Sequence, residues 1–206
     1  MKTFTAYKNK SKGFSLIELM VSLTIFSIVM TISMGTLLVL IDANAKAQAL
    51  SSAMTNLSFA MDSMTRSIRT GKDYYCAAAA SVAGTSAFNS NTQDCISGNT
   101  AIIFTPGFES EWRMAYRLNG TSIEQRIDKN GVAGDWVAIT SDQQPAAVVV
   151  DTLTFVVEGS ADTAAALPDF DQPRISLLVA GSVQNGLVNA TRFQIQSNVT
   201  QRVLNY

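Results

Sequence analysis

The chain has 206 residues, a formal net charge of −1, 47% hydrophobic residues and no histidine. Without an imidazole it cannot build a Ser-His or Cys-His nucleophile pair, and it lacks the usual nitrogen ligands of metal sites. No glycine-rich phosphate loop occurs in the sequence either. We therefore expect a protein that is not an enzyme and has no catalytic residue, cofactor or metal.

A long apolar run begins near the N-terminus. Four lysines and no acidic residue precede it: Lys2, Lys8, Lys10 and Lys12. The run covers residues 14–41 and contains one charge, Glu18. As a helix it would measure about 42 Å, against a hydrocarbon thickness of about 30 Å, so it can span a bilayer. Because basic residues favour the cytoplasmic side, we expect the remainder of the chain to be exported.

Two simpler interpretations of this start remain open. A secretory signal peptide has an apolar region of only about 7 to 15 residues, shorter than this run, although Ala43-Asn44-Ala45 has the form of a cleavage site. A plain signal anchor would place Glu18 near the membrane interface. Neither interpretation gives Glu18 a partner, although a carboxylate in a membrane helix costs at least about 2.5 kcal/mol.

The residues at the start of the run form a known motif: Lys12-Gly13-Phe14-Ser15-Leu16-Ile17-Glu18-Leu19-Met20-Val21. This sequence resembles the signature of type IV prepilins, which pilins share with the pseudopilins of type II secretion. The resemblance implies that a prepilin peptidase cuts between Gly13 and Phe14 and methylates the new N-terminus. It also implies that Glu18 pairs with the N-terminal ammonium of Phe14 in a neighbouring subunit. Such a partner would make the buried charge tolerable.

Loss of the leader would change the charge of the chain. Residues 1–13 contain four of the 15 basic residues and none of the 16 acidic ones, so the mature chain would carry a side-chain charge of about −5. This charge disfavours general binding to polyanions such as nucleic acid.

The helix is expected to continue beyond the apolar run. Hydrophobic residues recur at alternating spacings of four and three: Leu50, Met54, Leu57, Met61, Met64 and Ile68. This spacing predicts an amphipathic helix that ends at Arg69, with Gly71 as its stop signal. We expect the apolar face to pack on the chain's own later sheet. A self-associating coiled coil is the alternative.

The two cysteines, Cys76 and Cys95, lie in a stretch rich in serine, alanine, asparagine and glycine. Two cysteines can pair in only one way, and a disulfide that closes a loop of roughly 20 residues would stabilise the domain by about 3 kcal/mol. Such a bond persists in an oxidising compartment, which agrees with export. The alternative is two unrelated thiols.

From Thr100 onward the pattern is that of β-strands. We expect strands over residues 101–105, 112–118, 121–127, 136–140, 147–158, 173–183 and 190–204. Asn119-Gly120 predicts a hairpin with a type I′ turn. The predicted fold class is α+β: a long N-terminal helix packed on an antiparallel β-sheet domain, as in pilins.

The expected organisation has four parts: a cleaved leader (1–13), a transmembrane and assembly half of the helix (14–41), an amphipathic half (42–70) and an exported globular domain (71–206). Asp128-Lys129-Asn130-Gly131 is expected to be a turn, because Ile139 stands where a calcium loop needs its closing glutamate. A weaker calcium hypothesis concerns three loop aspartates: Asp162, Asp169 and Asp171.

The chain length, the helix end at 61–69, the strands of 112–140 and the ending at 193–202 resemble J-type minor pseudopilins and W-type minor pilins. This resemblance implies a non-enzymatic subunit at the tip or in the priming complex of a type II secretion pseudopilus or type IV pilus. Its N-terminus would be cytoplasmic, its helix would cross the inner membrane until assembly, and its domain would be periplasmic or extracellular. The implied partners are the prepilin peptidase, other pilins or pseudopilins, the inner-membrane assembly platform and membrane lipid. The alternatives are a surface adhesin or receptor module and a DNA-uptake pilus subunit.

Overall fold

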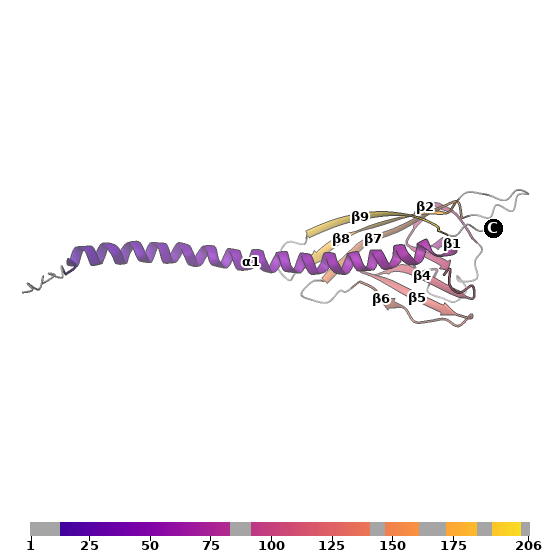
Figure 1. Cartoon of the computed structure of the whole chain (residues 1–206), viewed down its shortest axis with the longest axis horizontal. Helices are drawn as coiled ribbons and strands as arrows, with labels where there is room; N and C mark the ends of the chain where they lie inside the picture. Colours follow the sequence, from indigo (N-terminus) through magenta and orange to yellow (C-terminus); the bar gives the residue numbers. More distant parts are fainter. Residues whose placement is uncertain (1–12, 83–91, 141–146, 161–171, 185–190, 203–206) are drawn as a thin grey trace, which may run out of the picture. The chain divides into compact units, whose positions relative to one another are not determined.

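The computed structural model describes residues 13–82, 92–140, 147–160, 172–184 and 191–202. Internal contacts define two units, Met1–Ala45 and Lys46–Tyr206. One continuous helix, α1 (Leu16–Arg69), contributes to both (Figure 1).

In the first unit, α1 is apolar on all sides. The large hydrophobic side chains from Phe14 to Ile41 are all exposed in this single chain. Its hydroxyl groups are satisfied within the helix, since each donates to a carbonyl three or four residues earlier at 2.7–2.9 Å: Ser22, Thr24, Ser27, Thr31, Ser33 and Thr36. A helix with these properties is suited to lipid or to contact with other apolar helices.

The second unit contains two antiparallel sheets. Its strands are β1 (Lys72–Ala77), β2 (Cys95–Asn99), β3 (Ala101–Thr105), β4 (Trp112–Asn119), β5 (Ser122–Lys129), β6 (Val137–Ala138), β7 (Ala147–Glu158), β8 (Arg174–Gln184) and β9 (Thr191–Thr200). Sheet one has the order β1-β3-β4-β5-β6, and sheet two has the order β2-β7-β8-β9. In the view of Figure 1, β7–β9 and β4–β6 lie on opposite sides of the C-terminal part of α1.

The two sheets and the second half of α1 share one hydrophobic core. Leu57, Met64 and Ile68 are fully buried among residues of both sheets, and Leu50 and Met54 pack at the margin of the same cluster. The prediction that this helix face packs on the chain's own β-structure is therefore confirmed. Small residues that the spacing argument did not include are buried on this face as well: Ala49, Ala53 and Ala60.

Two buried tyrosines fasten the end of α1 to sheet one. The Tyr74 hydroxyl donates to the carbonyls of Ile68 and Gly71, each at 2.7 Å, and the Tyr116 hydroxyl lies 2.8 Å from Ser67 Oγ. The last carbonyls of a helix have no partner within it, so Tyr74 acts as a side-chain cap. Burial raises the pKa of Tyr74 above its usual value near 10, and the Asp73 charge raises it further.

Replacing Tyr74 by phenylalanine is expected to lower the free energy of unfolding by about 1–3 kcal/mol, because the buried Gly71 carbonyl loses the hydroxyl donor and the Ile68 carbonyl keeps only the Gly71 N–H, at 3.0 Å. The pKa is raised in the folded state, so the tyrosine's contribution is complete below pH 10 and is lost as the pH rises above 10. The variant should therefore lose less stability than wild type at alkaline pH. Denaturant titrations at pH 7 and above pH 10 measure both effects. Tyr75→Phe, at a half-buried neighbour, is the matched control, and an equal loss there would contradict the capping role.

The helix ends at Arg69 as expected, and Gly71 is needed there for packing. A β-carbon on Gly71 would lie 2.5 Å from the Phe104 ring, whereas the φ of Gly71 is not positive. The physical reason for the glycine is therefore the close approach of the aromatic ring, and the left-handed cap that usually explains such a residue is not formed.

The sequence-based prediction of the β-structure needs three corrections. The strands form two sheets where one was expected, and neither β1 nor β2 was predicted. The hairpin loop consists of Gly120 and Thr121, because Asn119 already pairs with Ser122. Only Gly120 in this loop has a positive φ, +59°, which is typical of a type II′ turn and excludes the type I′ turn. The strand expected at 136–140 is limited to Val137–Ala138, and the last strand ends at Thr200.

Candidate functional site

The predicted processing junction lies immediately before α1. Gly13 and Phe14 are exposed and outside the helix, which begins at Leu16. Apart from Gly13 and its two chain neighbours, no heavy atom of the described residues lies within 4 Å of the position that a β-carbon on Gly13 would occupy. The bond between Gly13 and Phe14 is therefore in an open segment that an enzyme could reach. The four leader lysines lie outside the described residues.

Ser15 caps the N-terminus of the helix. Its Oγ accepts a hydrogen bond from the Glu18 N–H at 3.2 Å, and its carbonyl accepts one from the Leu19 N–H at 3.2 Å. Serine followed three residues later by glutamate is the capping-box pattern. This function of the two residues was not predicted, although their spacing in the sequence shows the pattern. Glu18 thus has a local reason to stand in the first turn, because a carboxylate there also complements the helix dipole.

The Glu18 side chain itself has no partner among the described residues. Its hydrogen bonds are made by the backbone, through the N–H to Ser15 and through the carbonyl from Ser22, and the carboxylate is exposed. It is the one ionisable side chain in the apolar run of residues 14–41. An unpaired carboxylate surrounded by apolar side chains requires a cation from another chain, or from its own processed N-terminus, once water is excluded.

α1 is the one helix, among those in the described part of the chain, that is long and apolar enough to cross a membrane. The criterion is one of length and composition, and N-terminal signal sequences satisfy it too. Membrane insertion therefore rests on this helix together with the motif at its start.

A family comparison identifies that motif. The model of the prokaryotic N-terminal methylation motif matches residues 8–34, which include Gly13, Phe14 and Glu18. This match supports a type IV prepilin-like family, as the sequence motif predicts, and it does not distinguish J-type from W-type proteins. No curated protein and no solved structure matches the chain. The domain after residue 34 is therefore characterised by its own structure, an α+β pilin-like arrangement.

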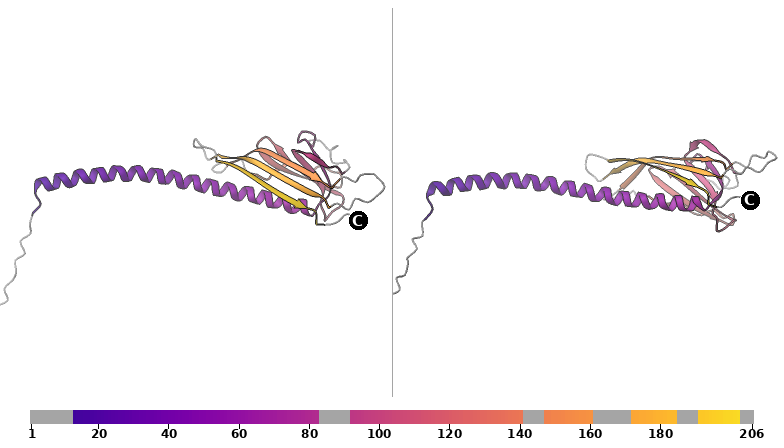
Figure 2. Two further views of the ribbon diagram at one scale, coloured as in Figure 1. Left: turned by 90° about the horizontal axis from the view of Figure 1, so that it is seen from above. Right: turned by 45° about the horizontal axis from the view of Figure 1, so that its top comes forward.

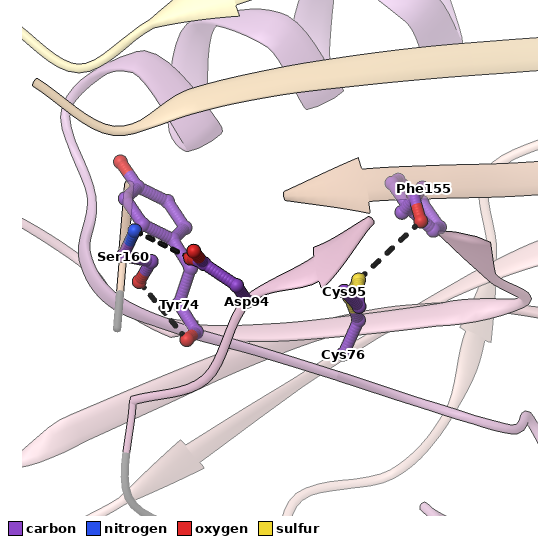
Figure 3. Close-up of a disulfide and its surroundings, with 6 residues drawn as sticks. All are labelled: Tyr74, Cys76, Asp94, Cys95, Phe155 and Ser160. Carbon is purple, nitrogen blue, oxygen red and sulfur yellow. Dashed lines mark hydrogen bonds between the residues drawn. A yellow bond between two sulfur atoms is a disulfide. The ribbon is translucent and has the colours of Figure 1, made fainter. Parts of the chain in front are cut away.

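The second candidate feature is the pair of cysteines, which the structure joins as a disulfide. Cys76 lies on β1 and Cys95 begins β2, and their α-carbons are 6.2 Å apart (Figure 3). β1 is an edge strand of sheet one and β2 is an edge strand of sheet two. The bond therefore connects the edges of the two sheets, which backbone pairing alone leaves separate.

Hydrogen bonds hold the same region beside the disulfide. The Asp94 carboxylate accepts from the Ser160 N–H at 2.7 Å, and the Ser160 hydroxyl donates to the Tyr74 carbonyl at 3.1 Å (Figure 3). The Gln93 N–H donates to the same carbonyl at 3.0 Å. Cys95 Sγ lies 3.6 Å from the Phe155 carbonyl oxygen. The start of β2 is thus fixed to β1 and β7 by several contacts that act together.

Removing the disulfide by Cys76→Ala and Cys95→Ala is expected to lower the free energy of unfolding by about 3 kcal/mol, because the bond closes a loop over a sequence separation of 19 residues. Membrane insertion should be unchanged, since it depends on the other unit. Denaturant titration of the double variant measures the loss, and non-reducing peptide mapping of exported wild type should recover the linked pair. Alkylation of both thiols without reductant would contradict the bond.

The structure describes one of the aspartates that were considered as calcium ligands, Asp128. Asp128 forms a two-bond ion pair with Arg126, at 2.7 and 2.8 Å, and accepts from the Gly134 N–H. Lys129 and Val132 close a turn, so the expectation of a turn is confirmed. Asp162, Asp169 and Asp171 lie outside the described residues. Among the described residues no group of three or more acidic or cysteine side chains is placed to hold a metal ion.

Proposed function

We propose that this protein is a minor pilin-like subunit that is processed by a prepilin peptidase and then assembled with other pilins or pseudopilins. The observation that carries the proposal is the methylation motif at residues 8–34, which covers the start of the exposed apolar run 14–41, where Glu18 is the sole ionisable side chain. A motif of this kind implies processing by the peptidase and assembly with other pilins.

Processing supplies the positive charge with which the Glu18 carboxylate can pair. Cleavage between Gly13 and Phe14 creates a new ammonium at Phe14, at the start of the apolar segment. In a fibre, the Glu18 carboxylate of one subunit pairs with that ammonium on its neighbour, and the apolar surfaces of the helices exclude water from the pair. An ion pair in such surroundings is tolerated only when both partners are present, so each subunit selects a processed neighbour.

The exported part of the subunit consists of the amphipathic half of the helix (42–70) and the globular domain (71–206). The pilin-type motif supports a structural role, in which the domain contributes shape and contact surfaces to the fibre. We place the chain at the tip or in the priming complex of a type II secretion pseudopilus or type IV pilus, because its size and strand pattern resemble J-type and W-type minor subunits. The inner-membrane assembly platform and lipid are its further partners.

Deleting the gene separates priming from other roles. A priming subunit is needed to start each fibre, so the deletion strain should have far fewer fibres, of nearly normal length. Electron microscopy of sheared fibres measures number and length together, with a complemented strain as control. A normal number of fibres in the deletion strain would overturn the priming role.

An exposed aromatic group favours a second function, that of a surface adhesin. The Phe108 side chain is 67% exposed and its ring meets Trp112 edge-on at 5.6 Å between centroids. Lys129 Nζ lies 4.5 Å from the centroid of the same tryptophan ring. Exposed aromatic rings are suited to ligand contact. The adhesin function predicts that the deletion strain keeps its fibres and loses attachment, which the same strains can show in an adhesion assay.

A further inference from the structure

A groove of about 740 Å³ lies between the last turns of α1 and the end of β9 in the second unit. One wall is formed by α1 through Asp62, Thr65, Arg66 and Arg69, and residues 197–202 form the other. Figure 2 shows β9, in yellow, running alongside this part of the helix. Its lining residues include neither those of the processing junction nor the two cysteines.

Among the described residues, no strand pairs with the outer backbone edge of the strand wall of this groove. β9 is the last strand of sheet two within the described residues, and it pairs with β8 without a register shift. The Gln201 N–H donates to the Pro173 carbonyl at 3.0 Å, on the β8 side. N–H directions alternate along an antiparallel strand, so the N–H groups of Asn198 and Thr200 face away from β8.

The same alternation shows where that edge faces. The Arg202 N–H has the direction of Asn198 and Thr200, and it donates to the Arg69 carbonyl of α1 at 2.8 Å. The outer edge of β9 therefore faces the helix across the groove and is closed at one end by this hydrogen bond. An edge with outward N–H and C=O groups is a template for another extended segment.

Three arginines surround the edge: Arg66, Arg69 and Arg202 are all exposed and line the groove. The acidic residue of the groove, Asp62, lies 3.4 Å from Arg66 in a highly exposed pair, which contributes little. Arg69 and Arg202 have no ion pair among the described residues. The helix dipole accounts for arginines in the last turns of α1, but Arg202 is outside the helix. The groove is thus basic in a chain whose net charge is −1.

We infer that this groove, called the β9 groove, binds an extended acidic segment of another protein, which adds as a strand to the outer edge of β9. The N–H groups of Asn198 and Thr200 donate to the carbonyls of the added segment. Its carboxylates meet Arg66, Arg69 and Arg202, whose charge-assisted hydrogen bonds select acidic sequences. The inference concerns the second unit and does not depend on processing of the N-terminus.

Fluorescence anisotropy with the full chain in detergent micelles tests this binding. The probe is a labelled peptide of about ten residues that alternates glutamate with threonine, and a version with lysine in place of glutamate is the matched control. The acidic peptide should bind and the lysine peptide should not. Arg69→Glu with Arg202→Glu should weaken binding at least about tenfold. Arg192→Glu, on the same strand outside the groove, should leave affinity within about twofold.

Proline substitutions test whether the peptide adds as a strand. Asn198→Pro and Thr200→Pro remove outward N–H groups and preserve the pairing with β8, so each should fold and lose peptide affinity. Gln194→Pro removes an N–H of the same direction outside the groove and should bind normally. A folded Asn198→Pro or Thr200→Pro variant with full affinity would overturn strand addition. Equal binding of both peptides, no binding of either, or self-association through the groove would overturn the proposed partner.

Discussion

Replacing Gly13 with leucine is expected to leave the leader uncut, so that the full-length precursor accumulates in membranes that contain a matched prepilin peptidase. The expected change is from nearly complete to undetectable processing. The effect is expected to arise in the peptidase complex, because no heavy atom of the described residues, apart from the chain neighbours of Gly13, lies within 4 Å of a β-carbon placed there. The folded structure therefore offers no other reason for a defect. Gel mobility and intact mass measure the ratio of precursor to mature chain.

Two controls make this result specific. Gly13→Ala adds only a methyl group and should still be cut, since alanine is the smallest side chain that replaces the glycine. Gly35→Leu adds the same large side chain within the apolar segment, also in open space, and should leave processing complete. Normal processing of Gly13→Leu, or failure of Gly35→Leu, would show that the peptidase does not select the small residue at position 13.

Replacing Glu18 with alanine is expected to abolish co-assembly and to preserve insertion and domain folding. The carboxylate has no partner in its own described chain, so its removal breaks no internal ion pair, and it makes the helix more apolar. Between subunits the same change leaves the neighbour's ammonium without a counter-charge in apolar surroundings, at a cost of several kcal/mol. Crosslinking to other pilin-like subunits and analysis of sheared fibres should both show strong loss.

Conservative variants distinguish charge from capping. Glu18→Gln retains the size of the side chain and removes its charge, so it should fail like alanine. Ser22→Ala, one turn further along α1, removes a hydroxyl that donates to the Glu18 carbonyl and should assemble normally. Co-assembly of Glu18→Ala at the wild-type level would mean that Glu18 serves its own helix start alone, and would favour the anchored adhesin.

Sequence patterns predicted those elements whose structure depends on residues close together in the chain. The apolar run, the motif around Gly13 and Glu18, and the spacing that buries Leu57, Met64 and Ile68 each depend on neighbours within a few residues. The long strands were visible for the same reason, because β7 and β8 have branched residues at regular intervals. The helix cap formed by Ser15 is also a local feature, since it can be predicted from the spacing of three residues between Ser15 and Glu18.

The features that the sequence did not reveal arise from irregular backbone and distant contacts. β1 has a register shift and an Asp73 with a φ of +56°, which disturb the alternation that marks a strand. β2 is short and polar, contains Gly98 with a φ of +77°, and pairs with a segment of β7 far along the chain. The β9 groove brings Arg69 and Arg202 together, which no spacing rule can show.

The identity of the N-terminal residue in membranes shows whether a prepilin peptidase processes this protein. We expect mass spectrometry of protein from cells that contain a matched prepilin peptidase to find Phe14 as the first residue, with a methyl group on its amine. The same sample should contain no peptide that joins Gly13 to Phe14. An intact leader would contradict prepilin processing, and a first residue of Lys46 would show that a signal peptidase had removed the apolar segment instead.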